Sequence, residues 1–146
     1  MATAYHEAAH AVLALALGFE LVRVSLGEDL TGEAEYVLQG PTHEALVVQV
    51  AGEIAGCRYR DDDRPRGGTH DVLTAAEIAE ALVAQEGYGA AVPGLRIQKL
   101  LELANGDARR LVEENWLAII RVAEALSLQG SLDAGQVRGL VDEAGN

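Results

Sequence analysis

The feature that most constrains the fold is the stretch His6-Glu7-Ala8-Ala9-His10, set within the apolar run of residues 2–17. If this run is helical, Glu7 lies at about 100° and His10 at about 40° around the axis from His6, so the three side chains share one face. Flanking Ala, Val and Leu give no sign of a solvated helix. Two imidazoles and a carboxylate on such a helix are costly to bury without partners.

This H-E-x-x-H pattern is typical of zinc sites. Two neutral imidazoles one turn apart can bind a zinc ion, and a carboxylate beside them can accept a proton from the zinc-bound water. The pattern therefore predicts Zn²⁺ as cofactor, with His6 and His10 as metal ligands and Glu7 as the catalytic general base. The alternative is an amphipathic helix whose two histidines share a face by chance, because short motifs carry a real false-positive risk. We favour the metal site.

Composition and charge limit the classes of protein and partner. The 146 residues are expected to form a single domain, 1–146, with a core of Ala, Leu, Val and Ile, since only 4% of residues are aromatic. A net charge of −12 argues against nucleic acid and anionic membranes as partners. No apolar run is long enough for a membrane segment, and no signal peptide is recognised. The single cysteine, Cys57, is expected to be a structural thiol in a reducing, cytoplasmic setting.

Hydrophobic periodicity predicts a mainly α-helical chain with a small β hairpin, an α+β fold. In the predicted first strand Val22, Val24 and Leu26 form the inward face, and the second strand covers residues 34–38. A strand edge beside a zinc helix can pair with an extended substrate, or it can simply cover the helix. Helices are predicted at residues 2–17, 42–57, 70–86, 95–114, 115–128 and 133–141.

Two other polar segments are given no role in the site. His43-Glu44 begins like a second zinc motif, but Val47 stands where the second histidine would be needed. The aspartates of residues 61–63 lack the spacing of a calcium-binding loop and are expected to lie in a solvated loop.

Asp71 follows Thr69 at the start of the third predicted helix, where a carboxylate can act simply as a favourable first-turn charge.

The order of these motifs resembles the peptidase domain of the FtsH-type ATP-dependent zinc proteases, the M41 peptidase family. The stretches that carry the resemblance read AYHEAAHA at 4–11, VAGEIA at 50–55 and GTHDVLTAA at 68–76. The segments ARRLVEEN at 108–115 and GSLD at 130–133 are similar to that family's C-terminal helices. The resemblance covers nearly the whole chain, and its motifs occur in the family's order.

The resemblance implies a zincin-like helical fold and a metalloendopeptidase that hydrolyses peptides or unfolded protein. It makes His6, His10 and Asp71 the zinc ligands, with water in the open fourth position, and Glu7 the general base. A homo-oligomer is also implied, although ring assembly in that family depends largely on its ATPase module. No Walker A sequence occurs in this chain, so hydrolysis is expected to be independent of ATP, and the sequence identifies no ATPase partner.

Several positions depart from the family's pattern. Ala9 replaces a glycine, and His70 replaces an asparagine and could compete with Asp71 for the metal. Gly56 and Cys57 replace part of an acidic pair. The oxyanion stabiliser is not assigned, either to His70 or to Tyr88. Two further hypotheses stay open: a zinc-binding but inactive interaction or adaptor domain, and a metal-free helical adaptor.

Overall fold

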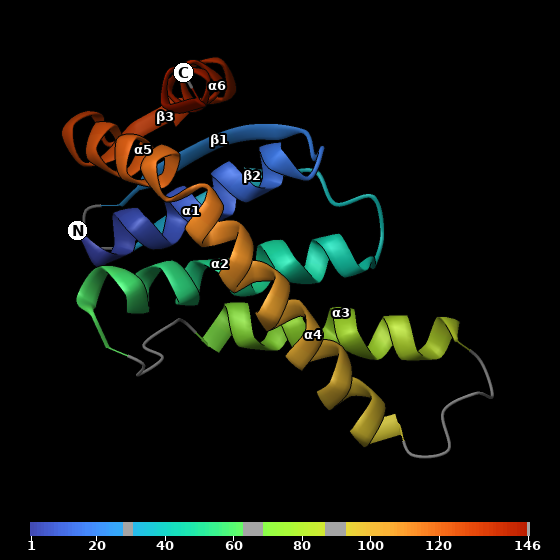
Figure 1. Cartoon of the computed structure of the whole chain (residues 1–146). Helices are drawn as coiled ribbons and strands as arrows, with labels where there is room; N and C mark the ends of the chain where they lie inside the picture. The colour runs from blue at the N-terminus through green and yellow to red at the C-terminus, as the bar shows by residue number, and fades with distance from the viewer. Residues whose placement is uncertain (28–30, 63–68, 87–92, 146) are drawn as a thin grey trace.

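The computed structural model describes residues 1–27, 31–62, 69–86 and 93–145, and of residues 69–73 the backbone alone. These residues form a mainly helical α+β fold with a small antiparallel sheet (Figure 1). In chain order the elements are α1 (Ala2–Ala16), β1 (Leu21–Leu26), β2 (Gly32–Tyr36), α2 (His43–Arg60), α3 (Thr69–Gln85), α4 (Pro93–Glu114), α5 (Trp116–Gln129), β3 (Ser131–Asp133) and α6 (Ala134–Gly145).

The helix ends explain why these segments are helical. Helix α1 ends before Gly18, whose φ of +85° is readily adopted only without a side chain. Helix α2 begins after Thr42, whose hydroxyl accepts a hydrogen bond from the Ala45 N–H at 3.0 Å. Asp133 and Gln136 form a capping box at the start of α6, with reciprocal bonds of 2.9 and 2.8 Å. The predicted helices are confirmed within the described residues, and so is the hairpin, although its second strand covers Gly32–Tyr36 rather than residues 34–38.

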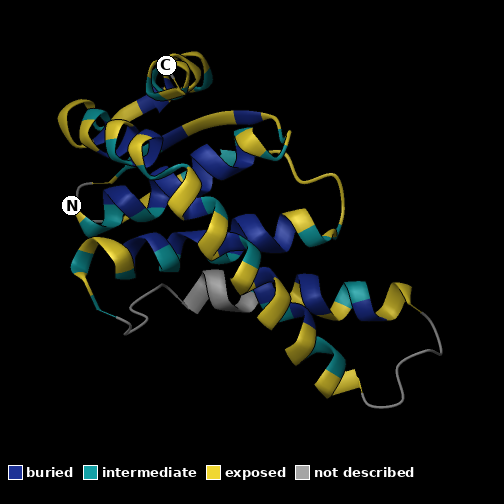
Figure 2. Ribbon diagram, in the orientation of Figure 1, coloured by how far each residue is buried: buried dark blue, intermediate teal, exposed yellow. Residues whose placement is uncertain are grey.

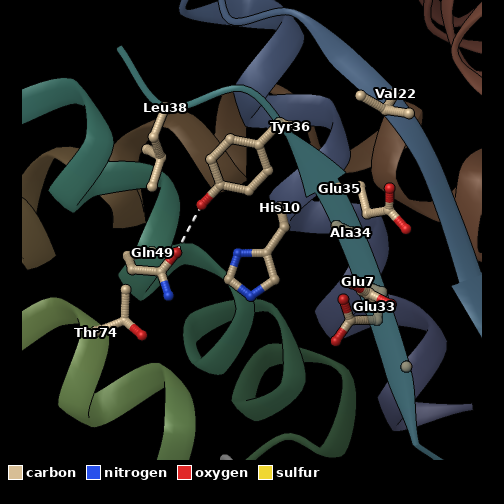
Figure 3. A pocket seen from close by; sticks show the side chains of 11 residues that line it. Glu7, His10, Val22, Glu33, Ala34, Glu35, Tyr36, Leu38, Gln49 and Thr74 are labelled. Carbon is tan, nitrogen blue, oxygen red and sulfur yellow. Dashed lines mark hydrogen bonds between the residues drawn. The ribbon is translucent and has the colours of Figure 1, made fainter. Parts of the chain in front are cut away.

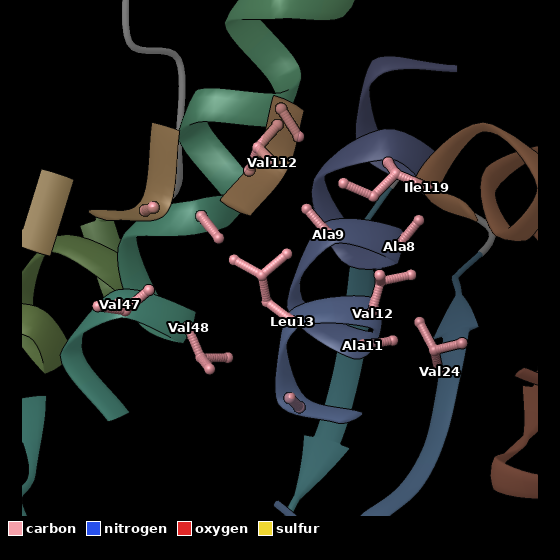
Figure 4. Packing of buried hydrophobic residues seen from close by; sticks show 14 of the residues in the cluster. Ala8, Ala9, Ala11, Val12, Leu13, Val24, Val47, Val48, Val112 and Ile119 are labelled. Atoms are coloured by element: carbon pink, nitrogen blue, oxygen red, sulfur yellow. The ribbon is translucent and has the colours of Figure 1, made fainter. Parts of the chain in front are cut away.

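Helix α1 lies at the centre of the molecule. It packs against α2, α5 and both strands of the hairpin, and most of its surface is buried (Figures 1 and 2). Fully buried alanines on α1 let neighbouring elements approach closely, and Leu13 fills the space towards Val48 of α2 (Figure 4). The scarcity of aromatic residues therefore leaves a core of small and branched aliphatic side chains. The buried alanines of this helix are Ala4, Ala8, Ala9, Ala11 and Ala14.

The sheet has the order β2-β1-β3, with both pairings antiparallel, so β2 lies at one edge. An irregularity between Leu21 and Arg23 interrupts the alternation along β1. As a result Leu21 is 3% exposed, whereas Val22 is 46% exposed. The prediction that Val22 faces inward is therefore wrong, because a one-residue shift moves a side chain to the other face. Strand β3 was not predicted.

An aromatic cluster joins α1, α2 and α5. The ring of Tyr5 stacks on Tyr59 at 4.4 Å between centroids and lies 5.3 Å from the ring of Trp116. Arg58 lies over the ring of Trp116, with its guanidinium carbon 3.9 Å from the ring centroid. The same guanidinium binds Glu113 of α4 through Nε and Nη2. The stacked rings of Tyr5 and Tyr59 thus connect α1 to α2. The brace formed by Arg58, Glu113 and Trp116 connects α2 to α4 and α5.

Among the described helices, none combines the length and the apolar character that crossing a lipid bilayer requires.

Candidate metal centre

His6, Glu7 and His10 converge on one face of α1, as their spacing predicts. A possible ligand atom from each of the three lies within 4.8 Å of those of the other two. The Nε2 atoms of the two imidazoles are 3.1 Å apart. A carboxylate oxygen of Glu7 is 3.9 Å from Nε2 of His6. The group lies in the wall of the molecule where α1 meets α2 and β2, and both Glu7 and His10 are buried.

The orientation of His10 is set by the backbone of α2. Its Nδ1 lies 2.8 Å from the carbonyl oxygen of Val48, which can only accept a hydrogen bond. Nδ1 therefore carries the proton, and in the neutral ring Nε2 presents its lone pair towards His6. A backbone carbonyl bound to the far nitrogen is the usual way in which a metal-ligating histidine is oriented.

Gly52 of α2 provides the space into which the imidazoles fit. A Cβ atom at this position would lie 2.5 Å from Nε2 of His10 and 2.6 Å from Nε2 of His6. Both distances are too short for any side chain, so only glycine allows α2 to pass here while the two nitrogens keep their positions. Gly52 belongs to the stretch VAGEIA that carries the family resemblance, but a role for it was not predicted from the sequence.

Glu53, next along α2, faces the other imidazole. Its Oε1 lies 3.8 Å from Nδ1 of His6, close enough for electrostatic attraction but beyond a direct hydrogen bond. A carboxylate on the far side of a metal-ligating imidazole favours the tautomer that offers Nε2 to a metal. In the sequence, Glu53 is marked only by following Gly52. Its contact with His6 becomes apparent only when α2 packs against α1.

Strand β2 holds Glu7 from the opposite side. A Cβ on Gly32 would lie 2.5 Å from Cγ of Glu7 and 3.2 Å from its Cδ, so the glutamate stem packs directly on the strand backbone. The side chain is thereby confined between α1 and β2. Only a glycine at the start of the strand permits this contact, and the hairpin thus fixes the place of the carboxylate.

A pocket of about 540 Å³ opens beside these residues. Figure 3 shows Tyr36 of β2 and Gln49 of α2 opposite Glu7 and His10, with Thr74 of α3 below. The Tyr36 hydroxyl donates a hydrogen bond of 2.6 Å to Oε1 of Gln49. The lining residues are Glu7, His10, Val22, Gly32, Glu33, Ala34, Glu35, Tyr36, Leu38, Gln49 and Thr74.

The geometry of the paired imidazoles suits a zinc ion. Two nitrogens bound to one tetrahedral zinc at 2.0–2.1 Å would lie about 3.3 Å apart, close to the 3.1 Å between the two Nε2 atoms. The fixed tautomer of His10 and the cradle at Gly52 keep both nitrogens directed at the same space. Imidazole and carboxylate are ligands that zinc accepts readily. The residues present therefore fit the metal.

Not every predicted residue can be placed. The side chains of Asp71 and His70 and the whole of Tyr88 lie outside the described residues. Thr74, one helical turn after Asp71 in α3, lines the pocket. His43, which was given no ligand role, hydrogen-bonds Asp107 of α4 at 2.7 Å, and this bond lowers the pKa of the Asp107 carboxyl.

Cys57 lies near the end of α2 and is a free thiol. Burial raises the pKa of its thiol above the ordinary value, although the nearby Arg60 guanidinium acts in the opposite direction. A raised pKa leaves less thiolate at neutral pH, as expected for a structural thiol.

The sequence matches no family model, and no curated protein matches it.

Proposed function

We propose that this protein is a zinc-dependent metalloendopeptidase with a zincin-like fold of the FtsH peptidase type. The observation that carries the proposal is the convergence of His6, Glu7 and His10 within 4.8 Å of one another, beside a pocket that Glu7 and His10 line. A pair of imidazoles alone would suit a structural metal. A buried carboxylate beside them, opening on a pocket of this size, favours chemistry on a bound substrate.

Zinc would be held by Nε2 of His6, Nε2 of His10 and the carboxylate of Asp71. Asp71 belongs to α3 and precedes Thr74 by three residues, and residues at this spacing share a helix face. Because Thr74 lines the pocket, a ligand from the first turn of α3 is the expected complement to the two imidazoles of α1. Three protein ligands leave one position open, as catalytic zinc sites require.

When bound, zinc supplies Lewis-acid polarisation of a peptide carbonyl and makes an adjacent water more acidic. Glu7 accepts a proton from the water while the oxygen of the water bonds to the carbonyl carbon. It then returns that proton to the amide nitrogen as the carbon–nitrogen bond breaks. Val48 and Glu53 keep the two imidazoles aligned through their far nitrogens. Gly32 holds the Glu7 stem so that its carboxylate stays beside the reacting bond.

The substrates would be peptides or unstructured protein segments. Strand β2 lies at the edge of the sheet and runs along the pocket, so an extended peptide can pair with its outer edge. Folded proteins are poor substrates in this proposal, because a strand must be extended to pair in this way. The proposed hydrolysis does not depend on ATP.

Glu7→Gln is the variant that tests the proposal. The amide has nearly the same shape but cannot accept a proton, so zinc occupancy stays at about one ion per chain while peptide hydrolysis falls by at least about 1000-fold. Zinc content is measured by elemental analysis, and hydrolysis is measured with unfolded casein or a quenched fluorescent peptide. Glu80→Gln, an exposed site on α3, is the matched control and keeps full activity.

The outcomes separate the alternatives. Loss of zinc in Glu7→Gln would make Glu7 a metal ligand rather than a base. Stoichiometric zinc in wild type without any cleavage would favour the inactive interaction domain. A wild-type chain that binds no zinc would leave the helical adaptor.

Asp71→Ala tests the third ligand. Removing one of three protein ligands is expected to weaken zinc binding by at least about 100-fold, measured by competition with a chromophoric chelator. His70→Ala is the companion variant and is expected to keep nearly wild-type affinity. If the two results are exchanged, His70 is the ligand and the Asp71 assignment is wrong.

A further inference from the structure

We propose that Gln49 of α2 binds the carbonyl oxygen of the peptide bond under attack, and that Tyr36 of β2 holds the Gln49 amide in the orientation this requires. The inference rests on the proposed function, and it assigns the oxyanion stabiliser that the sequence left open. Both residues line the pocket that also contains Glu7 and His10 (Figure 3).

The position of Gln49 on α2 brings its side chain next to the metal centre. Gly52, three residues later, contacts the Nε2 atoms of both imidazoles, and the carbonyl of Val48 binds His10. Residues three apart on a helix are neighbours, with Cβ atoms about 5–6 Å apart. Gln49 therefore stands one turn away from the point where α2 meets the two ligating nitrogens, on the pocket side.

Gln49 is a buried amide in an otherwise apolar part of α2, and the Tyr36 hydroxyl is one of its bonding partners. The side chain is 8% exposed, and it interrupts an apolar segment of α2 in which Leu46, Val48 and Ala51 are fully buried. Burying an amide among such residues is costly unless its polar atoms are bonded. Gln49 is the only amide side chain that lines the pocket in the described residues.

The hydrogen bond from Tyr36 fixes which end of the amide faces the substrate. The phenol donates to Oε1 at 2.6 Å, so the Nε2 group lies at the opposite end, on the side of Thr74 (Figure 3). An amide nitrogen can only donate, and it carries two N–H groups. One of them can bind a substrate oxygen while the other keeps a contact within the pocket wall. Such a donor becomes more effective as negative charge develops on the carbonyl oxygen.

Gln49→Met tests the donor directly, since it keeps the length of the side chain and removes both N–H groups. We expect kcat to fall about 100-fold with little change in KM, because the bond strengthens only as charge develops. Tyr36→Phe keeps Gln49 but releases its amide, and kcat is expected to fall about tenfold. Gln98→Met, at an exposed position on α4, is the matched control. All three variants are expected to keep wild-type zinc content.

A binding measurement provides a readout that does not depend on turnover. A phosphinic peptide carries a tetrahedral phosphorus with charged oxygens where the carbonyl group would be. Its affinity for the zinc-loaded protein is measured by calorimetry. In Gln49→Met this affinity is expected to fall by the same factor as kcat/KM. The affinity of acetohydroxamate, a small zinc chelator without a peptide frame, is expected to stay unchanged.

The results distinguish this inference from the proposed function. If wild type cleaves peptides in a Glu7-dependent manner but Gln49→Met keeps its kcat and its phosphinic-peptide affinity, the role of Gln49 is overturned and the peptidase stands. If wild type does not cleave but binds the phosphinic peptide through Gln49, the peptidase fails and the oxyanion site stands. If Gln49→Met does not fold, an unchanged phosphinic-peptide affinity in Tyr36→Phe overturns the inference.

Discussion

At the scale of single residues, the site depends on two glycines as much as on its polar groups. Gly52 and Gly32 contribute no side-chain groups, yet each leaves the space that a side chain of the candidate site occupies. Gly52 lies against the imidazoles of His6 and His10, and Gly32 lies against the stem of Glu7. Neither glycine has a positive φ, so the requirement is one of space and not of backbone conformation.

Under the proposed function, Gly52→Ala is expected to weaken zinc binding by about 100-fold, because the new methyl group displaces the Nε2 atoms of His6 and His10. Alanine is otherwise favoured over glycine within a helix by roughly 0.5–1 kcal/mol. Gly106→Ala is the matched control, since nothing lies within 4 Å of a Cβ at that position of α4. This control is expected to keep its zinc affinity and to gain about 0.4–1 kcal/mol of stability. Chelator competition and thermal unfolding measure the two effects, and equal zinc affinities in both variants would contradict the packing at Gly52.

At the scale of elements, the candidate metal centre lies where α1, α2 and β2 meet, and contacts away from it connect α2 to the rest of the fold. The brace of Arg58, Glu113 and Trp116 ties α2 to α4 and α5. A hydrogen bond from Arg58 lowers the pKa of the Glu113 carboxyl. A carboxyl with a lowered pKa in the folded state stabilises the fold above its unfolded pKa, about 4.3 for glutamate. That contribution is lost as the pH falls through the lower, folded value.

Glu113→Gln is therefore expected to melt at a lower temperature than wild type at pH 7, and the gap should close below about pH 4. The difference is expected to be small and to shrink in high salt, because the pair lies at the surface. Thermal unfolding followed by circular dichroism between pH 3 and pH 7 measures it. A gap that is the same at every pH would show that the ion pair does not contribute.

At the scale of the whole molecule, the sequence predicted those parts of the structure that depend on local pattern. Helical periodicity and end signals such as Thr42 and Gly18 are contained in a few neighbouring residues, and the predicted helices agree with the structure. Strand β3 was missed because its three residues carry no pattern of their own. They become a strand only by pairing with β1, far away in the chain. The irregularity that exposes Val22 likewise depends on pairing.

The same distinction holds for the site. His6, Glu7 and His10 lie within a single turn, so their convergence follows from the geometry of one helix. The contributions of Gly52, Glu53 and Gln49 arise only when α2 packs against α1, which no short motif encodes. The sequence therefore predicts that His6, Glu7 and His10 lie together, which the structure confirms, but it does not predict the residues of α2 that contact them.

The central claim is that two imidazoles of α1 bind a catalytic zinc ion beside Glu7. X-ray absorption at the zinc edge, on zinc-loaded wild type and Glu7→Gln, tests it most directly. The account predicts two imidazole ligands with bonds of about 2.0–2.1 Å and oxygen at the remaining positions, with the same spectrum in both proteins. A spectrum without imidazole scattering, or one that changes when Glu7 is replaced, would contradict it.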